Sequence, residues 1–338
     1  MGPRRSDVPL AGIDSWRAVI GPPESNAPEQ PRVVLAGAAG FIGSHLLRKL
    51  IGLGALVLGI DNLSTGRMEN VSWVPADAHV RLLVGDVADR KYLAEVRSFS
   101  PHIVIHLAAI HYIPYCMAHP AETFCVNVHG THALLASLLS LPVRAVVVAS
   151  SAAVYGFSDT PLSEHAPVHP EHVYGLSKYL AEEALHAFHG RRPDVRCVAA
   201  RLFNVYGRND GNAHVVPHLL AAARSGGPVP VGLLWPRRDF VYVEDVADAL
   251  IRMCRGPAED AVFNVGTGTG TSVLELIRAI EHLTGTHLEP RQDASRFREN
   301  EGHLVSDITS IRDRLGWTPQ VDLRRGLRAL VRAPASAA

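Results

Sequence analysis

The sequence of 338 residues lacks the features of several protein classes. It carries no net charge, because 33 Lys and Arg residues balance 33 Asp and Glu residues. Without clustered cations, binding to a nucleic-acid polymer is not expected. The four cysteines are far apart with no CxxC pair. We therefore expect reduced, partly buried thiols and no metal site.

Long hydrophobic runs are also missing. No window reaches the roughly 18 consecutive apolar residues that a membrane-spanning helix needs. The first residues lack the basic segment, apolar run and small-residue cleavage site of a signal peptide. A soluble, cytoplasmic protein with no membrane partner is therefore expected. Hydrophobic residues nevertheless make up 47% of the chain, which is enough for a large core, in two lobes rather than one.

Short apolar runs alternate with helical stretches from Arg32 onward. This alternation predicts right-handed crossovers and a Rossmann-type, doubly wound parallel sheet in an α/β domain. After Arg201 the alternation loosens into Pro and Gly clusters, which fits a second, smaller α/β lobe. The strands are expected at 32–36, 55–60, 81–84, 103–107, 145–149 and 196–200, and helices at 41–53, 127–139 and 174–189.

The two ends of the chain have a different composition. Residues 1–31 are rich in Pro, Arg, Ser and Glu, and predict a flexible extension. A flexible tail is expected at 331–338. Between them we expect the Rossmann domain at 32–203, with 238–266 returning to it, and the second lobe at 204–237 and 267–330.

A glycine-rich turn, GAAGFIG, follows the first predicted strand and opens the first predicted helix. Its glycines allow a tight turn and close approach to a pyrophosphate, for which the helix N-terminus offers unpaired N–H groups. Asp61 lies 24 residues after Gly37, where a carboxylate binds the adenosine ribose and repels the 2′-phosphate of NADP. The sequence therefore predicts NAD binding. Asp86 is either a second contact, to the adenine amino group, or a helix cap.

Tyr174 and Lys178 lie one helical turn apart on the same face of a predicted helix. A phenol with a pKa of about 10 is a poor base at neutral pH, but a nearby cation and a positive nicotinamide stabilise the phenolate. Ser151 stands at the carboxyl end of a predicted strand, where ligands bind in open α/β sheets. It could donate a hydrogen bond to a substrate hydroxyl. The alternative is an exposed Tyr–Lys pair on a solvated helix.

Nine motifs occur in a characteristic order between about residues 32 and 326. With them the sequence resembles the extended short-chain dehydrogenase/reductase family, and within it the nucleotide-sugar epimerase branch. The resemblance implies NAD as cofactor, a UDP-sugar as substrate, and a homodimer joined by a four-helix interface. The motifs are GAAGFIGSHL, DNLSTG, HLAA, NVHGT, SSAAVYG, YGLSK, RLFNVYG, RDFVYVEDVA and FNVGTG.

The resemblance also implies roles for individual residues. It makes Tyr174 the catalytic base, has Lys178 bind the nicotinamide ribose and lower the pKa of Tyr174, and gives Ser151 an assisting role. The residues implied in NAD binding are Tyr174 and Lys178 together with Gly37, Gly40, Phe41, Ile42, Gly43, Asp61, Asn62, Ser64, Thr65, Gly66, Asp86, Val87, Leu107, Ala108, Ala109, Asn127 and Ser150. Those implied in substrate binding are Ser151, Ala152, Tyr174, Asn204, Val216, Arg238, Arg298 and His111.

The residues after Ser151 separate branches of the family, whose members all oxidise the sugar at its 4-position. The 4,6-dehydratases usually carry Asp-Glu there, and the decarboxylases keep an acidic residue. Here both positions are alanine, Ala152 and Ala153, which cannot transfer protons. We therefore expect an NAD-dependent 4-epimerase of a UDP-hexose, UDP-hexosamine or UDP-hexuronate. A nucleotide-sugar reductase or dehydrogenase is the alternative, ahead of a 4,6-dehydratase or a non-catalytic NAD-binding protein.

Several positions near the expected sugar site depart from the family pattern. The usual GDG turn reads GLLW at 232–235, and the usual YGPxQ reads YGRND at 206–210. Gly211 stands where some uronate epimerases have Arg, which disfavours a uronate without excluding it. The sugar preference of galactose epimerases is therefore not carried over.

Two further assignments stay open in the sequence. The family's RPGE element is replaced by a stretch in which either Arg296 or Arg298 could bind the diphosphate. His111, Tyr112 and Tyr115 lie in a loop that should face the sugar, and aromatic packing is the alternative for them.

Overall fold

The computed structural model describes residues 30–212, 214–293 and 302–332. The predicted N-terminal extension lies almost entirely outside the described residues, as do Arg296 and Arg298. The predicted tail starts inside a helix that ends at Arg332. No described helix combines the length and the apolar character needed to cross a membrane.

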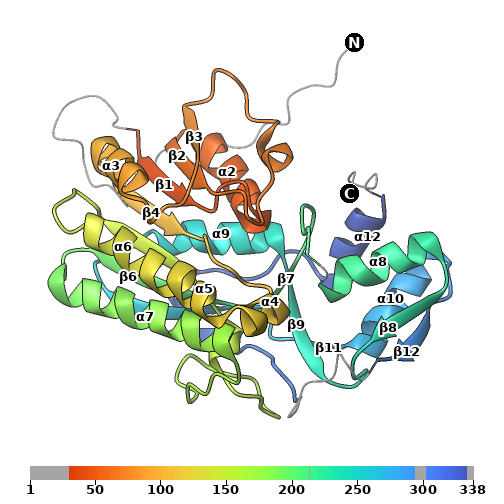
Figure 1. The fold of residues 1–338 in the computed structure, drawn as a ribbon. Coiled ribbons are helices and arrows are strands. Elements are labelled where there is room, and N and C mark those ends of the chain that lie inside the picture. The colour runs from red at the N-terminus through yellow and green to blue at the C-terminus, as the bar shows by residue number, and fades with distance from the viewer. Residues whose placement is uncertain (1–29, 213, 294–301, 333–338) are drawn as a thin grey trace.

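Seven parallel strands form the central sheet (Figure 1), in the order β10-β6-β5-β4-β1-β2-β3. The predicted Rossmann-type sheet is therefore confirmed, and each predicted strand begins and ends within two residues of the observed one. Because β1 lies between β2 and β4, the strand order reverses there, and the crevice at this switch point is where such sheets bind dinucleotides. The strands are β1 Arg32–Ala36, β2 Leu56–Asp61, β3 Val80–Val84, β4 Ile103–His106, β5 Ala145–Ser151, β6 Arg196–Leu202 and β10 Asp260–Val265.

Helices cover both faces of this sheet. Successive residues of a strand point to opposite faces, so Val33 and Leu35 of β1 join one core while Val34 and Ala36 join the other. On the first face lie α2 Phe41–Gly52, α9 Val243–Met253 and α11 Thr309–Leu315. On the second lie α3 Arg90–Phe99, α6 Gly130–Ser137 and α7 Val173–Arg191, with α4 Ile113–Ala118 and α5 Pro120–Phe124 leading into α6.

The second lobe has its own core and two small sheets. One sheet has the order β11-β9-β7, and the other pairs β8 with β12. Helices α8, α10 and α12 form the right-hand part of Figure 1, and their apolar side chains pack with those of β8 and β9 into one core. The elements are β7 Asn204–Tyr206, β8 Pro228–Val231, β9 Arg237–Tyr242, β11 Gly270–Ser272, β12 Glu289–Gln292, α8 Val215–Ser225, α10 Val273–Thr284 and α12 Leu323–Arg332.

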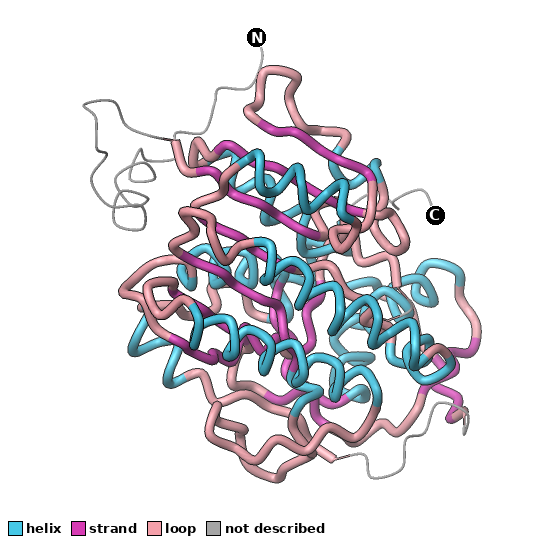
Figure 2. The backbone as a smooth tube through the Cα atoms, turned by 60° about the vertical axis from the view of Figure 1, so that its left-hand side comes forward, coloured by secondary structure: helices cyan, strands magenta, loops and turns pink. Residues whose placement is uncertain are grey.

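The chain passes between the two cores more than once (Figure 2). Within the segment 238–266, β9 lies in a small sheet while α9 and β10 belong to the large domain. Further along, Ile311 of α11 and Trp317 also join the large core, and the Trp317 indole N–H donates to the Asp245 carbonyl of α9 at 3.1 Å. The predicted domain boundaries stay a prediction.

Candidate active site

The glycine-rich turn between β1 and α2 is folded very tightly. Gly37 has a φ of 84°, and a Cβ on it would lie 2.8 Å from the amide nitrogen of Ala108. A Cβ on Gly43 would lie 1.9 Å from the Gly37 carbonyl oxygen. Only glycine allows such approaches. Within the described part of the chain, α2 has no side-chain cap and no acid in its first turn, so its N–H groups can take a pyrophosphate.

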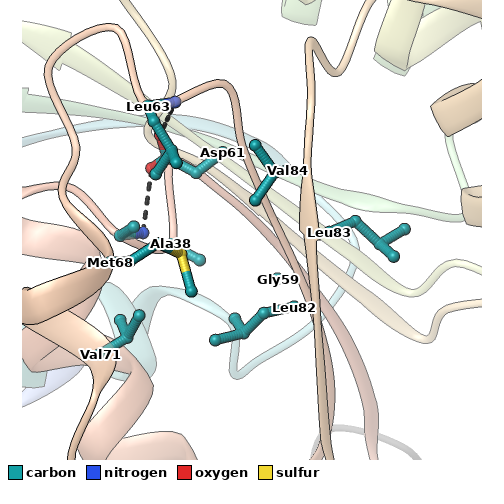
Figure 3. Close-up of a pocket in the computed structure, with 10 residues that line it drawn as sticks. Ala38, Gly59, Asp61, Leu63, Met68, Val71, Leu82, Leu83 and Val84 are labelled. Atoms are coloured by element: carbon teal, nitrogen blue, oxygen red, sulfur yellow. Dashed lines mark hydrogen bonds between the residues drawn. The ribbon is translucent and has the colours of Figure 1, made fainter.

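Asp61 ends β2 beside this turn. Its Oδ2 accepts the Ala39 N–H at 2.9 Å, and its Oδ1 accepts the Leu63 N–H at 2.8 Å. Gly66 passes so closely that a Cβ there would lie 2.7 Å from Oδ1. The carboxylate borders an apolar pocket (Figure 3) whose other lining residues are Ala38, Ala39, Gly59, Leu63, Met68, Val71, Leu82, Leu83 and Val84. An anchored carboxylate beside an apolar recess fits the ribose and base of an adenosine.

The other residues after β2 and β3 that were predicted to bind the cofactor do not line this pocket. Asn62, Ser64 and Thr65 form an exposed loop, in which the Asn62 side chain accepts the Ser64 N–H at 3.0 Å. Asp86 accepts the Ala88 N–H at 2.8 Å, whereas the N-cap of α3 is Asp89. Asp86 therefore caps the turn that precedes the helix, and its contact with adenine stays a prediction.

Tyr174 and Lys178 are both buried, on the face of α7 that packs against β5. Lys178 donates a hydrogen bond to the Ala149 carbonyl at 2.7 Å, and burial lowers its pKa to about 8. Burial also raises the pKa of Tyr174 to about 12, although a hydrogen bond with Ser151 acts to lower it. The predicted phenol, ammonium and hydroxyl therefore lie together at the carboxyl end of β5, and the alternative of an exposed pair is wrong.

Ser150 belongs to a buried polar network instead of facing open space. Its hydroxyl donates to Glu182 of α7, which forms an ion pair with Arg201 of β6 at 2.7 Å. Arg201 donates to the Tyr155 hydroxyl at 2.8 Å, and that hydroxyl donates to Asn264 at 2.8 Å. A cofactor contact of Ser150 stays a prediction. Sequence reasoning missed Glu182, although its spacing of one helical turn after Lys178 is a usable signal.

Asn127 lies in a π turn, Cys125–His129, where the sequence predicted regular helix from residue 127. Its side-chain amide donates to the Ile110 carbonyl at 2.8 Å and to the Ser177 hydroxyl at 2.9 Å. Its side-chain oxygen accepts the Ile110 N–H at 2.8 Å. Asn127 thus ties the segment after β4 to α7, while its expected contact with the cofactor stays a prediction.

That segment also brings a cysteine to Tyr174. Cys116 is fully buried and packs with Ile110 and Tyr174, and burial raises the pKa of its thiol. All four cysteines are free, and Cys125 is the exposed one. The buried position of Cys116 against Tyr174 was not visible in the sequence, because it depends on how the segment after β4 folds back.

The residues of the loop that was expected to face the sugar have different environments in the structure. His111 is half-buried, its Nε2 lies 3.0 Å from the Asn212 side-chain amide, and burial together with nearby His214 lowers its pKa to about 4. Its ring is therefore neutral and accepts a hydrogen bond from Asn212. Tyr115 instead is exposed, lies with its ring tilted against that of His119 at 4.2 Å between centroids, and donates to the Glu122 carboxylate at 2.9 Å.

The residues expected to hold the substrate lie at the junction of the two lobes. Asn204 of β7 pairs in register with Phe240 of β9, the strand that carries Arg238. Arg238 donates to the Gly302 carbonyl at 2.7 Å, and its guanidinium lies 5.2 Å from the centre of the Phe157 ring. These contacts place the guanidinium beside the junction.

Two other substrate candidates are buried. Ala152 is 3% exposed next to Ser151, and Val216 is 2% exposed within the second core. Val216 therefore contributes packing in this structure, and a contact of its side chain with substrate stays a prediction.

A glycine-rich turn at the switch point of a parallel sheet, together with a buried tyrosine and lysine at the carboxyl end of β5, is typical of a nicotinamide-dependent enzyme of the short-chain dehydrogenase/reductase type. The glycine cradle and the pocket beside Asp61 fit NAD. The profile of the "NAD dependent epimerase/dehydratase family" matches residues 33–266. The chain therefore belongs to this family, its cofactor is NAD, and it is an NAD-dependent epimerase.

Individual relatives agree with this assignment. The chain is 34% identical over 321 residues to a UDP-glucose 4-epimerase of Rhizobium leguminosarum bv. trifolii, covering 88% of this chain and 95% of that one. Its fold is similar to MoeE5 in complex with UDP-glucose and NAD, with a TM-score of 0.80, 30% identity, and 89% and 97% coverage. It is also similar to a UDP-N-acetylglucosamine 4-epimerase of Methanobrevibacter ruminantium M1, with a TM-score of 0.81, 28% identity, and 90% and 97% coverage.

Proposed function

We propose that this protein interconverts two UDP-sugars that differ in configuration at carbon 4. The observation that carries the proposal is the pair of alanines that follows Ser151. Ala152 is buried directly after Ser151, and the Ala153 carbonyl lies where a Cβ on Gly175 would approach it to 2.0 Å. Neither alanine can transfer a proton, so the site supports reversible oxidation and not the elimination of water.

The chemistry follows from the positions of three side chains. The Tyr174 phenolate takes the proton of the sugar 4-hydroxyl and later returns it to the 4-keto oxygen. Lys178 stabilises the phenolate by its positive charge, and Ser151 donates a hydrogen bond to the reacting oxygen. The glycine-rich turn and Asp61 would hold NAD, which would supply reversible hydride exchange with carbon 4. Between the two transfers the keto sugar turns about its diphosphate linkage, so the opposite face is presented.

This sequence of steps needs a firmly held nucleotide and a loosely held sugar. The junction of β7 and β9 offers Asn204 and Arg238 for the nucleotide diphosphate, and named relatives act on UDP-glucose or UDP-N-acetylglucosamine. We therefore propose a UDP-sugar of the hexose, hexosamine or hexuronate series.

A panel of nucleotide sugars tests the proposal. Purified protein is incubated separately with UDP-glucose, UDP-GlcNAc and UDP-glucuronate, and the products are separated by anion-exchange chromatography. We expect the 4-epimer of at least one of them to accumulate to equilibrium with no net formation of NADH. Formation of NADH in proportion to product would instead show a dehydrogenase. If no nucleotide sugar yields a stereoisomer, the proposal is wrong.

We also propose a homodimer formed through the layer of α4 to α7. Apolar side chains lie exposed on this layer, with Met117 of α4 54% exposed and Leu176 and Leu180 of α7 39% and 36% exposed. An exposed apolar patch of this kind is typical of an interface. Sedimentation of the protein and of Leu180→Glu tests it, because a charge at the centre of a dimer interface should give monomers. A parent protein that sediments as a monomer would contradict the interface.

A further inference from the structure

A segment of residues 207–212 after β7, here named the crossing segment, lies against the start of α2. A Cβ on Gly207 would lie 2.3 Å from a side-chain carbon of Val243 and 3.4 Å from the Phe41 ring, which is an ordinary contact distance. The Arg208 carbonyl accepts a hydrogen bond from His45 at 2.9 Å, and the Asn209 side chain donates to the Ser44 hydroxyl at 3.1 Å. One end of the crossing segment is thus fastened to the helix whose N-terminus faces the expected pyrophosphate.

The other end of the crossing segment reaches the opposite wall of the crevice. Asn212 donates to the ring of His111, in the segment after β4, at 3.0 Å. Midway, a Cβ on Gly211 would lie 3.9 Å from the guanidinium of Arg67, in the loop after β2. The crossing segment therefore contacts the chain that follows β1, β2 and β4, the three strands around the switch point.

The crossing segment is also held in shape by its own contacts. The Asp210 side chain is 2% exposed and lies 2.9 Å from the His214 ring, and its Oδ1 accepts the Asn212 N–H at 3.4 Å. Asn209 has a φ of 67°, a left-handed conformation that asparagine tolerates. A segment that is already held in one conformation loses little conformational entropy when it covers a ligand.

We propose that the crossing segment is part of the NAD-binding site and retains the cofactor by bridging the crevice above the pyrophosphate. The hydrogen bonds from Asn209 to Ser44 and from Asn212 to His111 must break before NAD leaves. The proposal rests on NAD as the cofactor and is independent of the sugar, so it stands or falls separately from the proposed 4-epimerisation.

Release of NAD from the holoenzyme tests the proposal without any sugar present. Protein loaded with radiolabelled NAD is chased with excess unlabelled NAD and filtered at intervals. Asn212→Ala removes one of the two hydrogen bonds, and Asn209→Gly removes the other while keeping the left-handed backbone. Each variant should release NAD about fivefold faster, which corresponds to one lost hydrogen bond. Gln320→Ala, which removes an exposed side-chain amide from the second lobe, is the matched control and should release NAD at the parent rate.

Thermal unfolding of the NAD-free proteins separates retention from general destabilisation. The proposal expects both variants to unfold within a few degrees of the parent while releasing NAD faster. If both release NAD at the parent rate, or if faster release occurs only together with a large loss of stability in the NAD-free protein, the crossing segment does not retain the cofactor.

Discussion

The cofactor side and the sugar side of the crevice are built in different ways. On the cofactor side, backbone meets backbone at distances that only glycine permits, as at Gly37 and Gly43. In the region expected to hold the sugar, Trp235 of the altered turn at 232–235 is 56% exposed. The comparison teaches that the turn expected to bind the cofactor depends on close backbone contacts that tolerate no side chain, whereas the turn at 232–235 has an exposed side chain with room to change.

The strongest test of this contrast removes one oxygen on the cofactor side. Tyr174→Phe should lower kcat by about a thousandfold, because general acid–base catalysis is worth that order. NAD content should be unchanged, since the phenol is not among the groups that hold the adenosine end. Turnover and bound NAD are measured on the same preparation. A variant that still epimerises at near the parent rate would exclude Tyr174 as the base.

A glycine pair tests the close backbone contacts. Gly43→Ala places a Cβ 1.9 Å from a backbone oxygen, and should cost about 1–3 kcal/mol of unfolding free energy and most of the bound NAD. Gly190→Ala in α7 meets no heavy atom within 4 Å, and should stabilise the helix by up to about 1 kcal/mol. Urea unfolding and NAD content measure both. Equal behaviour of the two variants would contradict the contrast.

The charge on Lys178 gives an expected pH dependence. Its pKa is lowered to about 8, so its ammonium loses the proton as the pH rises through 8 and turnover should fall. In Lys178→Arg the guanidinium keeps its charge, so the alkaline fall should shift upward, while the plateau drops about tenfold because a guanidinium fits the Ala149 carbonyl differently. Rates between pH 6 and 10 measure this. An unchanged alkaline limb would show that another group titrates.

The smallest effect is expected on the sugar side. Trp235→Ala should change the ratio of kcat/KM values between two UDP-sugars by about threefold, the range of a modest apolar contact, with NAD content unaffected. Competition between the two sugars in one vessel measures the ratio. A loss of bound NAD in this variant would break the division between the two sides.

The fold was predictable because most strands of the central sheet, such as β1, β4, β5 and β6, are buried on both faces. Such strands are continuous apolar runs, and the predicted boundaries of β2 at 55–60 lie within one residue of Leu56–Asp61. The cofactor turn was predictable for a related reason, since its glycines are required by local geometry. The shared helix face of Tyr174 and Lys178 followed from the helical period, whereas their burial became visible only in the structure.

The rest depends on contacts between distant segments. The hydroxyl of Ser150 is taken by Glu182, whose charge is compensated by Arg201 from another strand, and a buried ion pair leaves no local pattern in a sequence. The crossing segment is a further case, because its asparagines acquire meaning only when Ser44 and His111 are brought to either side. Arg296 and Arg298 lie outside the described residues, so the choice between them stays open.

The π turn at Cys125–His129 has a consequence for how this chain can change in length. A π turn holds one residue more than an α turn and is often a single insertion within a helix. Deleting one residue there should leave α6 in phase, with Leu134 still facing the core, while Asn127 loses its place opposite Ser177. The fold could therefore lose this extra residue, but the hydrogen bonds by which Asn127 joins the segment after β4 to α7 could not form without it.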